Sequence, residues 1–316
     1  MVTGLIEEFA KVLIFGAIKS GVYALLALGF TLIYGISGVV NLAHGSFYML
    51  GAYLFFVIGG SLASILSVEL IDLPLPLSIL ALIGAVVLVA IIGSLTYRLT
   101  IHPVLGDEVA VMVVTVCVAL IFQQLILIGF GATSPPVSWP GDTFLRKSIL
   151  IPFLNLPLMW SRILAFSVSL ILFVSLVLVI ARTKIGKAMR AVSQDREVAM
   201  LVGVNTNRLY TLTMGVSAML AAIASILITT SFEMYAGPWM WLNPLALSFS
   251  IVILGGLGSI KGSLVGAFIL GYAEQGVIEA LPEGGQIIGI VPLIVMVSVL
   301  LIRPKGLFGK RIEMEE

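Results

Sequence analysis

The sequence predicts an all-α, polytopic membrane protein with about eight to ten transmembrane helices. Of its 316 residues, 60% are hydrophobic and only 10% are charged, about half the charge that a soluble chain needs to cover its surface. The mean hydropathy is +1.18. Apolar stretches recur at about the 20 residues that a helix needs to cross a hydrocarbon core of roughly 30 Å. We therefore expect a single transmembrane domain over residues 1–316.

Nine segments have a suitable length and composition. The N-terminus is not a cleavable signal, because Glu7 and Glu8 stand where a basic region is usual and the apolar run that follows is too long. The seventh segment is short for a full crossing and Gly-rich near its end, so we expect it to be broken or tilted. In chain order the segments cover residues 11–35, 44–60, 77–97, 108–130, 161–181, 208–231, 243–258, 262–281 and 286–302.

Lys and Arg are divided unequally between alternate loops. One set of loops, together with the C-terminal tail, holds twelve of the seventeen, whereas the opposite loops hold only Arg146 and Lys147. By the positive-inside rule the first set is cytoplasmic, so we predict the N-terminus outside and the C-terminus inside. The outer loop at about 131–160 is Pro-rich, and we expect an irregular cap or a surface for an external partner. The four tryptophans, expected as interfacial anchors, are Trp139, Trp160, Trp239 and Trp241.

The longest polar stretch, at about 182–208, follows the fifth segment. It holds six Lys and Arg against two acids, and its apolar residues recur at spacings of three and four. This pattern predicts a short amphipathic helix with one apolar face. A plain connector needs only a few polar residues, so we expect a soluble partner to move the membrane domain through this segment. Its apolar residues are Ala188, Met189, Ala191, Val192, Val198, Ala199, Met200, Leu201 and Val202, closed by Gly203.

Two clusters of small and polar residues interrupt the apolar pattern. Asn41, His44 and Ser46 stand between the first two segments, where they either form a cytoplasmic turn or break a helix inside the bundle and line a solvated path. His44 alone is more typical of a hydrogen-bonded structural histidine than of a proton relay. The second cluster permits a sharp turn before Ser259 and close helix packing after it, or a seam that moves during transport. Its glycines are Gly255, Gly256, Gly258, Gly262 and Gly266, of which the last three are four residues apart.

Polar side chains inside apolar segments are candidates for function. A charge at a helix centre costs on the order of 2.5–3.5 kcal/mol on insertion scales. Lys19 lies within the first segment, and we expect it to snorkel outward, the alternative being a pair with Glu233 or Glu274. The candidates for a translocation path are Asn41, His44, Ser46, Gln123, Gln124 and Glu274, although such glutamines more often bond to neighbouring helices.

Several absent motifs limit the chemistry of the chain. His44 and His102 are the only histidines, so no HExxH motif or His-based metal site is expected. There is no GxSxG and no GxxxxGK[ST] phosphate loop. We therefore expect that the chain is not an enzyme and binds no metal or cofactor. The energy for any active transport should come from a partner or an ion gradient. The net charge of +1 does not indicate nucleic acid, and the single Cys117 forms no intrachain disulfide.

Four stretches of the chain resemble a known family. Residues 40–53 (VNLAHGSFYMLGAY) are similar to the motif after the first helix of LivH-type permeases, the membrane subunits of ABC importers for branched-chain amino acids. Residues 182–192 with Asp195 and 201–205, residues 255–259 with Gly262, and the tail 303–309 match as well. Together they cover almost the whole chain in the right order. Urea, amide and some sugar permeases share much of this pattern.

The resemblance implies a set of partners in a prokaryotic inner membrane, in contact with membrane lipid. A second, homologous permease subunit would complete the pore, two cytoplasmic ABC ATPase subunits would hydrolyse ATP, and a periplasmic or extracellular binding protein would deliver the substrate. By this resemblance, residues 186–203 would form the coupling helix that sits in a cleft of the ATPase. The residues expected to take part in this coupling are Gly186, Lys187, Arg190, Asp195, Arg196, Glu197 and Gly203. Ser46, where the family often has Glu, and Lys19 depart from the pattern. The alternatives are a self-contained facilitator or ion-coupled carrier and, with least support, a membrane enzyme.

Overall fold

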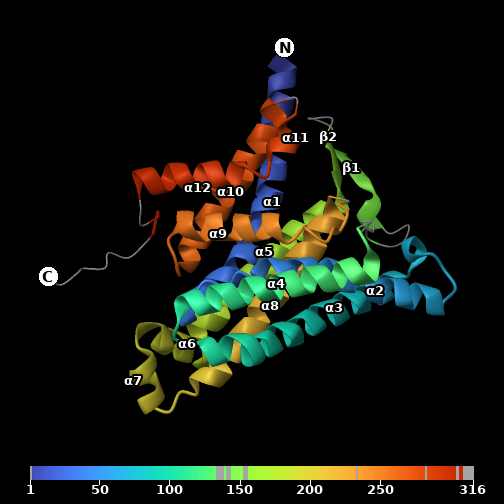
Figure 1. Cartoon of the computed structure of the whole chain (residues 1–316). Helices are drawn as coiled ribbons and strands as arrows, with labels where there is room; N and C mark the ends of the chain where they lie inside the picture. Colours follow the sequence, from blue (N-terminus) through green and yellow to red (C-terminus); the bar gives the residue numbers. More distant parts are fainter. Residues whose placement is uncertain are drawn as a thin grey trace.

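The computed structural model describes residues 2–132, 139, 144–151, 156–232, 234–281, 283–303 and 306–308. This part of the chain is largely α-helical, which confirms the predicted class (Figure 1). The helices are α1 (Val2–Ser37), α2 (His44–Ile65), α3 (Leu75–Thr96), α4 (Glu108–Phe130), α5 (Trp160–Arg182), α6 (Lys184–Gln194), α7 (Arg196–Leu201), α8 (Thr206–Ser231), α9 (Leu242–Gly255), α10 (Ile260–Ala280), α11 (Gly284–Ile287) and α12 (Val291–Ile302). A π-helical turn, Tyr97–Ile101, and a 3-10 turn, His102–Val104, extend α3.

Among the described residues, six helices are long and apolar enough to cross a membrane: α1, α2, α3 with its extension, α4, α5 and α8. Helices α9 and α10 are bent by 119° at a short break, and the count becomes seven if this pair is one span. The ninth expected segment contains the end of the short helix α11 and the 12-residue helix α12. Nine separate crossings are thus not confirmed. The break after α9 is the one that the short, Gly-rich seventh segment indicated.

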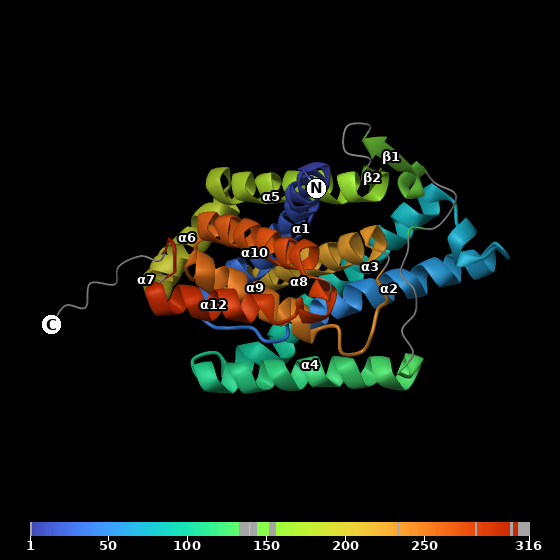
Figure 2. The same cartoon turned by 90° about the horizontal axis from the view of Figure 1, so that it is seen from above.

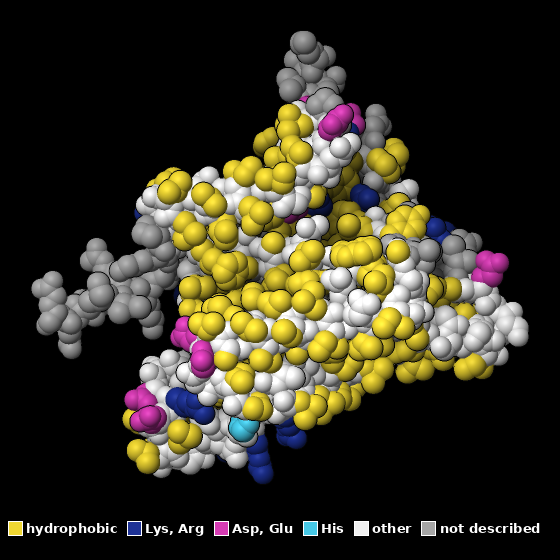
Figure 3. Space-filling model, in the orientation of Figure 1, with side chains coloured by type: hydrophobic (Ala, Val, Ile, Leu, Met, Phe, Trp, Pro, Cys, Tyr) yellow, Lys and Arg dark blue, Asp and Glu magenta, His cyan; other side chains and the backbone are white. Residues whose placement is uncertain are grey.

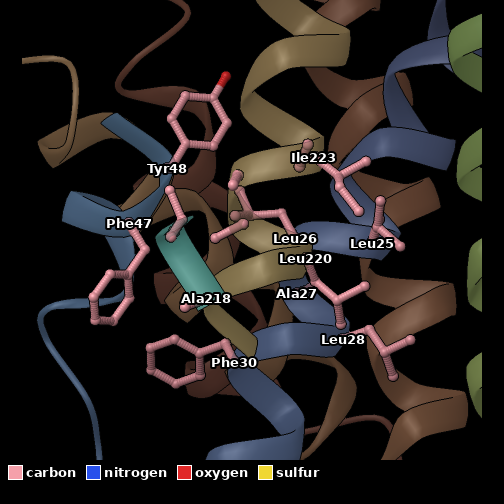
Figure 4. Packing of buried hydrophobic residues seen from close by; sticks show 14 of the residues in the cluster. Leu25, Leu26, Ala27, Leu28, Phe30, Phe47, Tyr48, Ala218, Leu220 and Ile223 are labelled. Carbon is pink, nitrogen blue, oxygen red and sulfur yellow. The ribbon is translucent and has the colours of Figure 1, made fainter. Parts of the chain in front are cut away.

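The bundle is organised around α1, α2 and α8. Helix α1 packs along α8 and α10, and α2 and α3 pack on α8. Figure 4 shows large apolar side chains of α1, such as Leu26 and Phe30, meeting Phe47 of α2 and Leu220 of α8. Helices α4 and α5 lie on opposite sides of this centre, as the view in Figure 2 shows. Because these apolar side chains are tightly packed, the polar residues that lie between the same helices are held in fixed positions.

The outer surface of the bundle is apolar. Large side chains that are about half exposed or more include Ile83 of α3, Val113 of α4 and Ile171 of α5. Hydrophobic side chains form a broad band across the face in Figure 3. A soluble monomer rarely exposes such a surface, whereas lipid tails cover it without penalty. Together with the six long apolar helices, this surface is that of a multi-pass membrane protein.

The outer loop is more regular than the sequence indicated. Strands β1 (Ser148–Ile151) and β2 (Leu156–Met159) pair antiparallel, and the β-branched Ile149 and Ile151 favour extended backbone. Trp139 is buried, with its ring centroid 6.0 Å from that of Phe55 in α2. Residues 133–138, 140–143 and 152–155 of this loop lie outside the described residues. The loop therefore caps α2, at the end of the bundle away from α6 and α7 (Figure 2).

Candidate translocation and coupling site

The polar segment after α5 forms two short helices and not the single amphipathic helix expected. Helix α6 begins after Thr183, whose Oγ1 accepts a hydrogen bond from Gly186 N at 3.2 Å. Asp195 has an extended backbone, and its Oδ1 accepts from Glu197 N and Val198 N at 2.8 and 3.0 Å. An aspartate cap satisfies the free amides at the start of α7, and its extended backbone ends α6. Gly203, with φ of +87°, closes α7.

One group of the predicted coupling residues attaches this segment to the bundle. A Cβ at Gly186 would overlap the backbone of Ile180 near the end of α5. The Arg190 guanidinium donates a hydrogen bond to the carbonyl oxygen of the same Ile180. Met189 and Val192 of α6 are buried as well. Gly186 and Arg190 therefore hold α6 against α5. The charge pattern of the sequence did not indicate this structural role.

The exposed part of the segment is apolar at its tip. Leu201 is 85% exposed and Val202 is 74% exposed, and Val198 beside them is also exposed. Lys187 and Glu197 are exposed on the same two helices. An apolar patch with a charged rim is typical of a protein–protein contact. The candidate list drawn from the sequence lacked Leu201 and Val202, although their place at the end of a polar stretch is a detectable signal. Figure 1 shows α7 protruding from one end of the molecule.

A cleft of about 690 Å³ lies between this segment and the bundle. Its walls come from the end of α1, the turn before α4, helices α6 and α7, and the turn between α9 and α10. The Arg196 guanidinium lies 5.7 Å from the centroid of the Tyr210 ring. The Tyr210 hydroxyl in turn donates to the Ile36 carbonyl oxygen at 3.5 Å. Arg196 therefore contacts the bundle and links α7 to α8 and to the end of α1.

The first polar cluster lies inside the bundle and bonds to it. His44 is completely buried, with Nε2 3.1 Å from the Leu26 carbonyl oxygen and Nδ1 3.2 Å from Ser217 Oγ. A carbonyl only accepts, so Nε2 carries the proton and Nδ1 accepts from Ser217. The Ser46 hydroxyl donates to the Ala43 carbonyl oxygen at 2.7 Å. His44 thus has the bonds of a structural histidine at the start of α2.

Asn41 shapes the turn that precedes α2. Its Oδ1 accepts from Ala43 N at 3.0 Å, and its Nδ2 lies 3.4 Å from the Met214 sulfur. The amide of Leu42 donates to Thr115 Oγ1 of α4 at 3.2 Å. These bonds hold the chain in a turn between α1 and α2, and a role of this turn in lining a path stays a prediction.

Polar residues of α1 and α10 meet inside the bundle. Glu274 is 3% exposed, and its Oε2 accepts a hydrogen bond from the Tyr23 hydroxyl at 2.6 Å. Lys19 is 9% exposed, with Nζ 5.8 Å from the Phe232 ring centroid, and it is attracted electrostatically by Glu274. Lys19 does not snorkel outward as expected, because an opposite charge and an aromatic face lie inside. Glu233, the other partner considered, lies outside the described residues.

The two glutamines of α4 differ in their surroundings. Gln123 Oε1 accepts from Trp241 Nε1 at 2.6 Å, a bond that joins α4 to the start of α9. Gln124 is exposed on the surface of the bundle. Trp241 and Trp139 are buried, so the interfacial role expected of all four tryptophans fits only Trp160 and Trp239, which are exposed. The Gln123 bond is of the helix-to-helix kind that the sequence favoured for these amides.

The glycine cluster brings α9 and α10 into backbone contact. A Cβ at Gly262 would overlap the backbone of Gly255, and one at Gly266 would press on the Ile251 carbonyl. Gly256 and Gly258 have φ of +98° and +78° and form the turn between the helices. Gly258 is therefore outside α10, so the expected row of three glycines on one helix face is reduced to Gly262 and Gly266.

The sequence over residues 12–300 matches the family model described as branched-chain amino acid transport system / permease component. The chain belongs to this family. It is 29% identical to the high-affinity branched-chain amino acid transport system permease protein BraD of Pseudomonas aeruginosa, over 96% of this chain and 97% of that protein. It is 27% identical to the permease protein LivH of Escherichia coli K12, over 93% and 94% of the two chains.

A solved structure shares the fold. PsaBC from Streptococcus pneumoniae, solved in complex with a Fab, superposes with a TM-score of 0.50 and 16% sequence identity, over 96% of this chain and 97% of that one. The family match confirms the resemblance seen in the motifs: the chain is a membrane permease subunit of the ABC importer type. A transporter permease component is not an enzyme class.

Proposed function

We propose that the chain forms part of the translocation path for branched-chain or related apolar amino acids. The names of its relatives support this substrate class, because they match over nearly the full length of both chains. The chain itself binds no cofactor, and partner subunits hydrolyse the ATP. A second, homologous permease subunit completes the path, and a binding protein outside the cell delivers the substrate.

The proposed topology has the N-terminus outside and the C-terminus in the cytoplasm. The excess of Lys and Arg in the loops on the α6–α7 side supports this orientation. The β1–β2 hairpin lies at the opposite end in Figures 1 and 2, where a binding protein would arrive. The chain acts as a single transmembrane domain, with its coupling segment at about 182–208 and its outer loop at about 131–160.

The exposed apolar tip of α7 carries this proposal. Two ATPase subunits dock on the cytoplasmic side of the transporter, one of them on Leu201 and Val202, with Lys187 and Glu197 at the rim of the contact. ATP-driven closure of the ATPase subunits then pulls α7. The link from Arg196 through Tyr210 to Ile36 passes this movement to the end of α1. The remaining coupling residues, Gly186, Arg190, Asp195 and Gly203, keep the segment in shape.

Within the membrane the candidates have different duties. Asn41, His44, Ser46 and Gln123 are held by the bonds described above, which supports a role in shaping the path. Glu274 is the acidic side chain among the six candidates, and a buried acid of this kind in a membrane segment marks function by default. The contacts around Gly262 and Gly266 support a tightly packed seam between α9 and α10, with the turn at Gly256 and Gly258 as its hinge.

Reconstitution tests this proposal. The chain, its ATPase subunits, a second permease subunit and the binding protein are assembled in liposomes, and uptake of labelled leucine, urea, acetamide and ribose is measured with and without ATP. We expect ATP-dependent leucine uptake. Uptake by the chain alone, indifferent to ATP, would establish a facilitator instead, and uptake of only urea, the amide or the sugar would move the substrate to another branch of the family.

A further inference from the structure

A basic cavity lies at the end of α3 that is nearest the α6–α7 segment. Its volume is about 400 Å³, and it is lined by Arg98, His102, Asn205, Asn207, Arg208 and Thr211. Two guanidinium groups and an imidazole converge here without an acidic side chain in the lining. Figure 3 shows Lys and Arg side chains beside a histidine at the lower edge of the molecule, next to the hydrophobic band.

A second groove continues from this cavity along the bundle. It has a volume of about 440 Å³ and shares Arg98 and Thr211 with the basic cavity. Val87, Ile91 and Leu95 of α3 form its wall at spacings of four residues, and Met219 of α8 also lines it. These three α3 side chains are each about half exposed on the surface of the bundle. A polar chamber therefore opens directly into an apolar channel that faces the lipid.

The two arginines have free hydrogen-bonding capacity. Within the described ranges, no carboxylate lies within ion-pair distance of Arg98 or Arg208. Guanidinium groups bind phosphate oxygens through paired N–H donors, and weak hydration makes Arg well suited to this contact. The Thr211 hydroxyl, which also lines the cavity, donates to the Asn207 carbonyl oxygen one turn earlier in α8 at 2.8 Å. An anion is the ligand that this charge distribution favours.

The length of the groove identifies the kind of anion. From Arg98 to Val87 the helix advances about 16 Å, at 1.5 Å for each of eleven residues. This distance is about half of a hydrocarbon core of roughly 30 Å, and hence one leaflet. A basic cavity at the membrane surface with an apolar groove one leaflet deep matches a phospholipid: an anionic head group followed by an acyl chain.

We propose that this site binds an anionic phospholipid. The head-group phosphate lies between Arg98 and Arg208, and one acyl chain follows Val87, Ile91 and Leu95 between α3 and α8. The occupied groove would fix the end of α3 against the start of α8, next to Tyr97, whose hydroxyl donates to Asn207 Oδ1 at 3.2 Å. This assignment rests on the groove and its charges, and it holds whichever substrate the permease carries.

The test places a reporter in the groove. Ile91→Trp puts an indole about 10 Å from Arg98 along the helix, near the middle of an acyl chain. The full chain, alone and in the assembled transporter, is placed in bilayers of phosphatidylglycerol and phosphatidylcholine in which one lipid carries 9,10-dibromo acyl chains. Quenching of the added tryptophan, relative to the protein without it, reports which lipid occupies the groove. Arg98→Gln with Arg208→Gln removes the proposed head-group contacts, and Arg182→Gln with Lys184→Gln removes the same charge elsewhere on that side.

We expect stronger quenching by brominated phosphatidylglycerol than by brominated phosphatidylcholine. Loss of both arginines should lower this selectivity by about thirtyfold, because each basic side chain near an anionic surface accounts for about fivefold. The control pair should retain it. Equal quenching by the two lipids, or a preference unchanged in the Arg98 and Arg208 variant, would overturn the proposal. Quenching of the isolated chain that disappears in the assembled transporter would overturn it too, because a protein subunit would then cover the groove.

Discussion

The centre of the bundle and the α6–α7 segment differ in what happens to the less common kind of side chain in each. At the centre the chain is mostly apolar, and polar side chains such as His44, which lies between Leu26 and Ser217, are used in internal bonds. In α6 and α7 the chain is polar, and its apolar residues Leu201 and Val202 are the ones left exposed. In a membrane permease a polar residue in a span is thus weak evidence for a substrate contact, whereas an apolar residue in a charged loop is good evidence for a protein partner.

The backbone contact between α9 and α10 should show the largest effect. Gly262→Ala should lower the free energy of unfolding by about 1–3 kcal/mol, and Gly262→Leu by more, because the added atoms meet the backbone of Gly255, which has no rotamer to yield. Thermal melting of the purified protein in detergent measures this. Gly276→Ala on the same helix is the control, because its Cβ has no neighbouring atom within 4 Å. Equal melting temperatures for Gly262→Ala and Gly276→Ala would show that the contact is incidental.

A charge introduced at the tip of α7 should weaken binding of the ATPase subunit without destabilising the fold. Leu201→Glu should weaken binding of the ATPase subunit by about thirtyfold, the effect of losing one central contact of about 2 kcal/mol. Copurification and a binding titration measure it, with an unchanged melting temperature as evidence of folding. Gln194→Glu adds the same charge to an exposed site at the end of α6 and should leave binding within twofold. Full binding by Leu201→Glu would remove the tip from the contact.

Substitution of His44 distinguishes a structural role of this residue from a role in transport. His44→Leu leaves the Ser217 hydroxyl and the Leu26 carbonyl without their partner, which should cost about 2 kcal/mol of unfolding free energy. The exposed His102→Leu should change the unfolding free energy by less than about 0.5 kcal/mol. A His44→Leu protein that melts like the parent but fails to transport would place His44 on the path instead.

The smallest effect should come from the link between the two regions. Arg196→Gln removes a cation–π contact of about 0.5–1 kcal/mol, so substrate moved per ATP should fall about two- to fivefold while the ATPase subunit stays bound. Tyr210→Phe keeps the ring that Arg196 contacts but removes the hydroxyl bond to the Ile36 carbonyl, so it should lower this ratio as well. Parallel assays of uptake and ATP hydrolysis in liposomes measure the ratio. If Arg196→Gln instead releases the ATPase subunit, the side chain faces the partner and not Tyr210.

The length of the apolar stretches predicted helices in the bundle, although not the number of crossings, and the short, Gly-rich seventh segment predicted the break after α9. Both features depend on local sequence. The division of α6 from α7 was not predicted, since the cap formed by Asp195 overrides an apolar spacing that continues through it. The burial of Lys19 was also missed, because its surroundings come from α8 and α10, far away in the chain. The bond between Trp241 and Gln123 joins residues 118 positions apart and has no local signal.

The most direct test of the account is the side of the membrane on which the α7 tip lies. Leu201→Cys in a Cys117→Ala background provides a single exposed thiol for a membrane-impermeant maleimide. We predict no labelling in intact cells, labelling in inverted vesicles, and protection in those vesicles when the ATPase subunit is bound. Labelling of Leu201→Cys from outside intact cells would contradict the central claim, because a cytoplasmic ATPase could then not reach the tip.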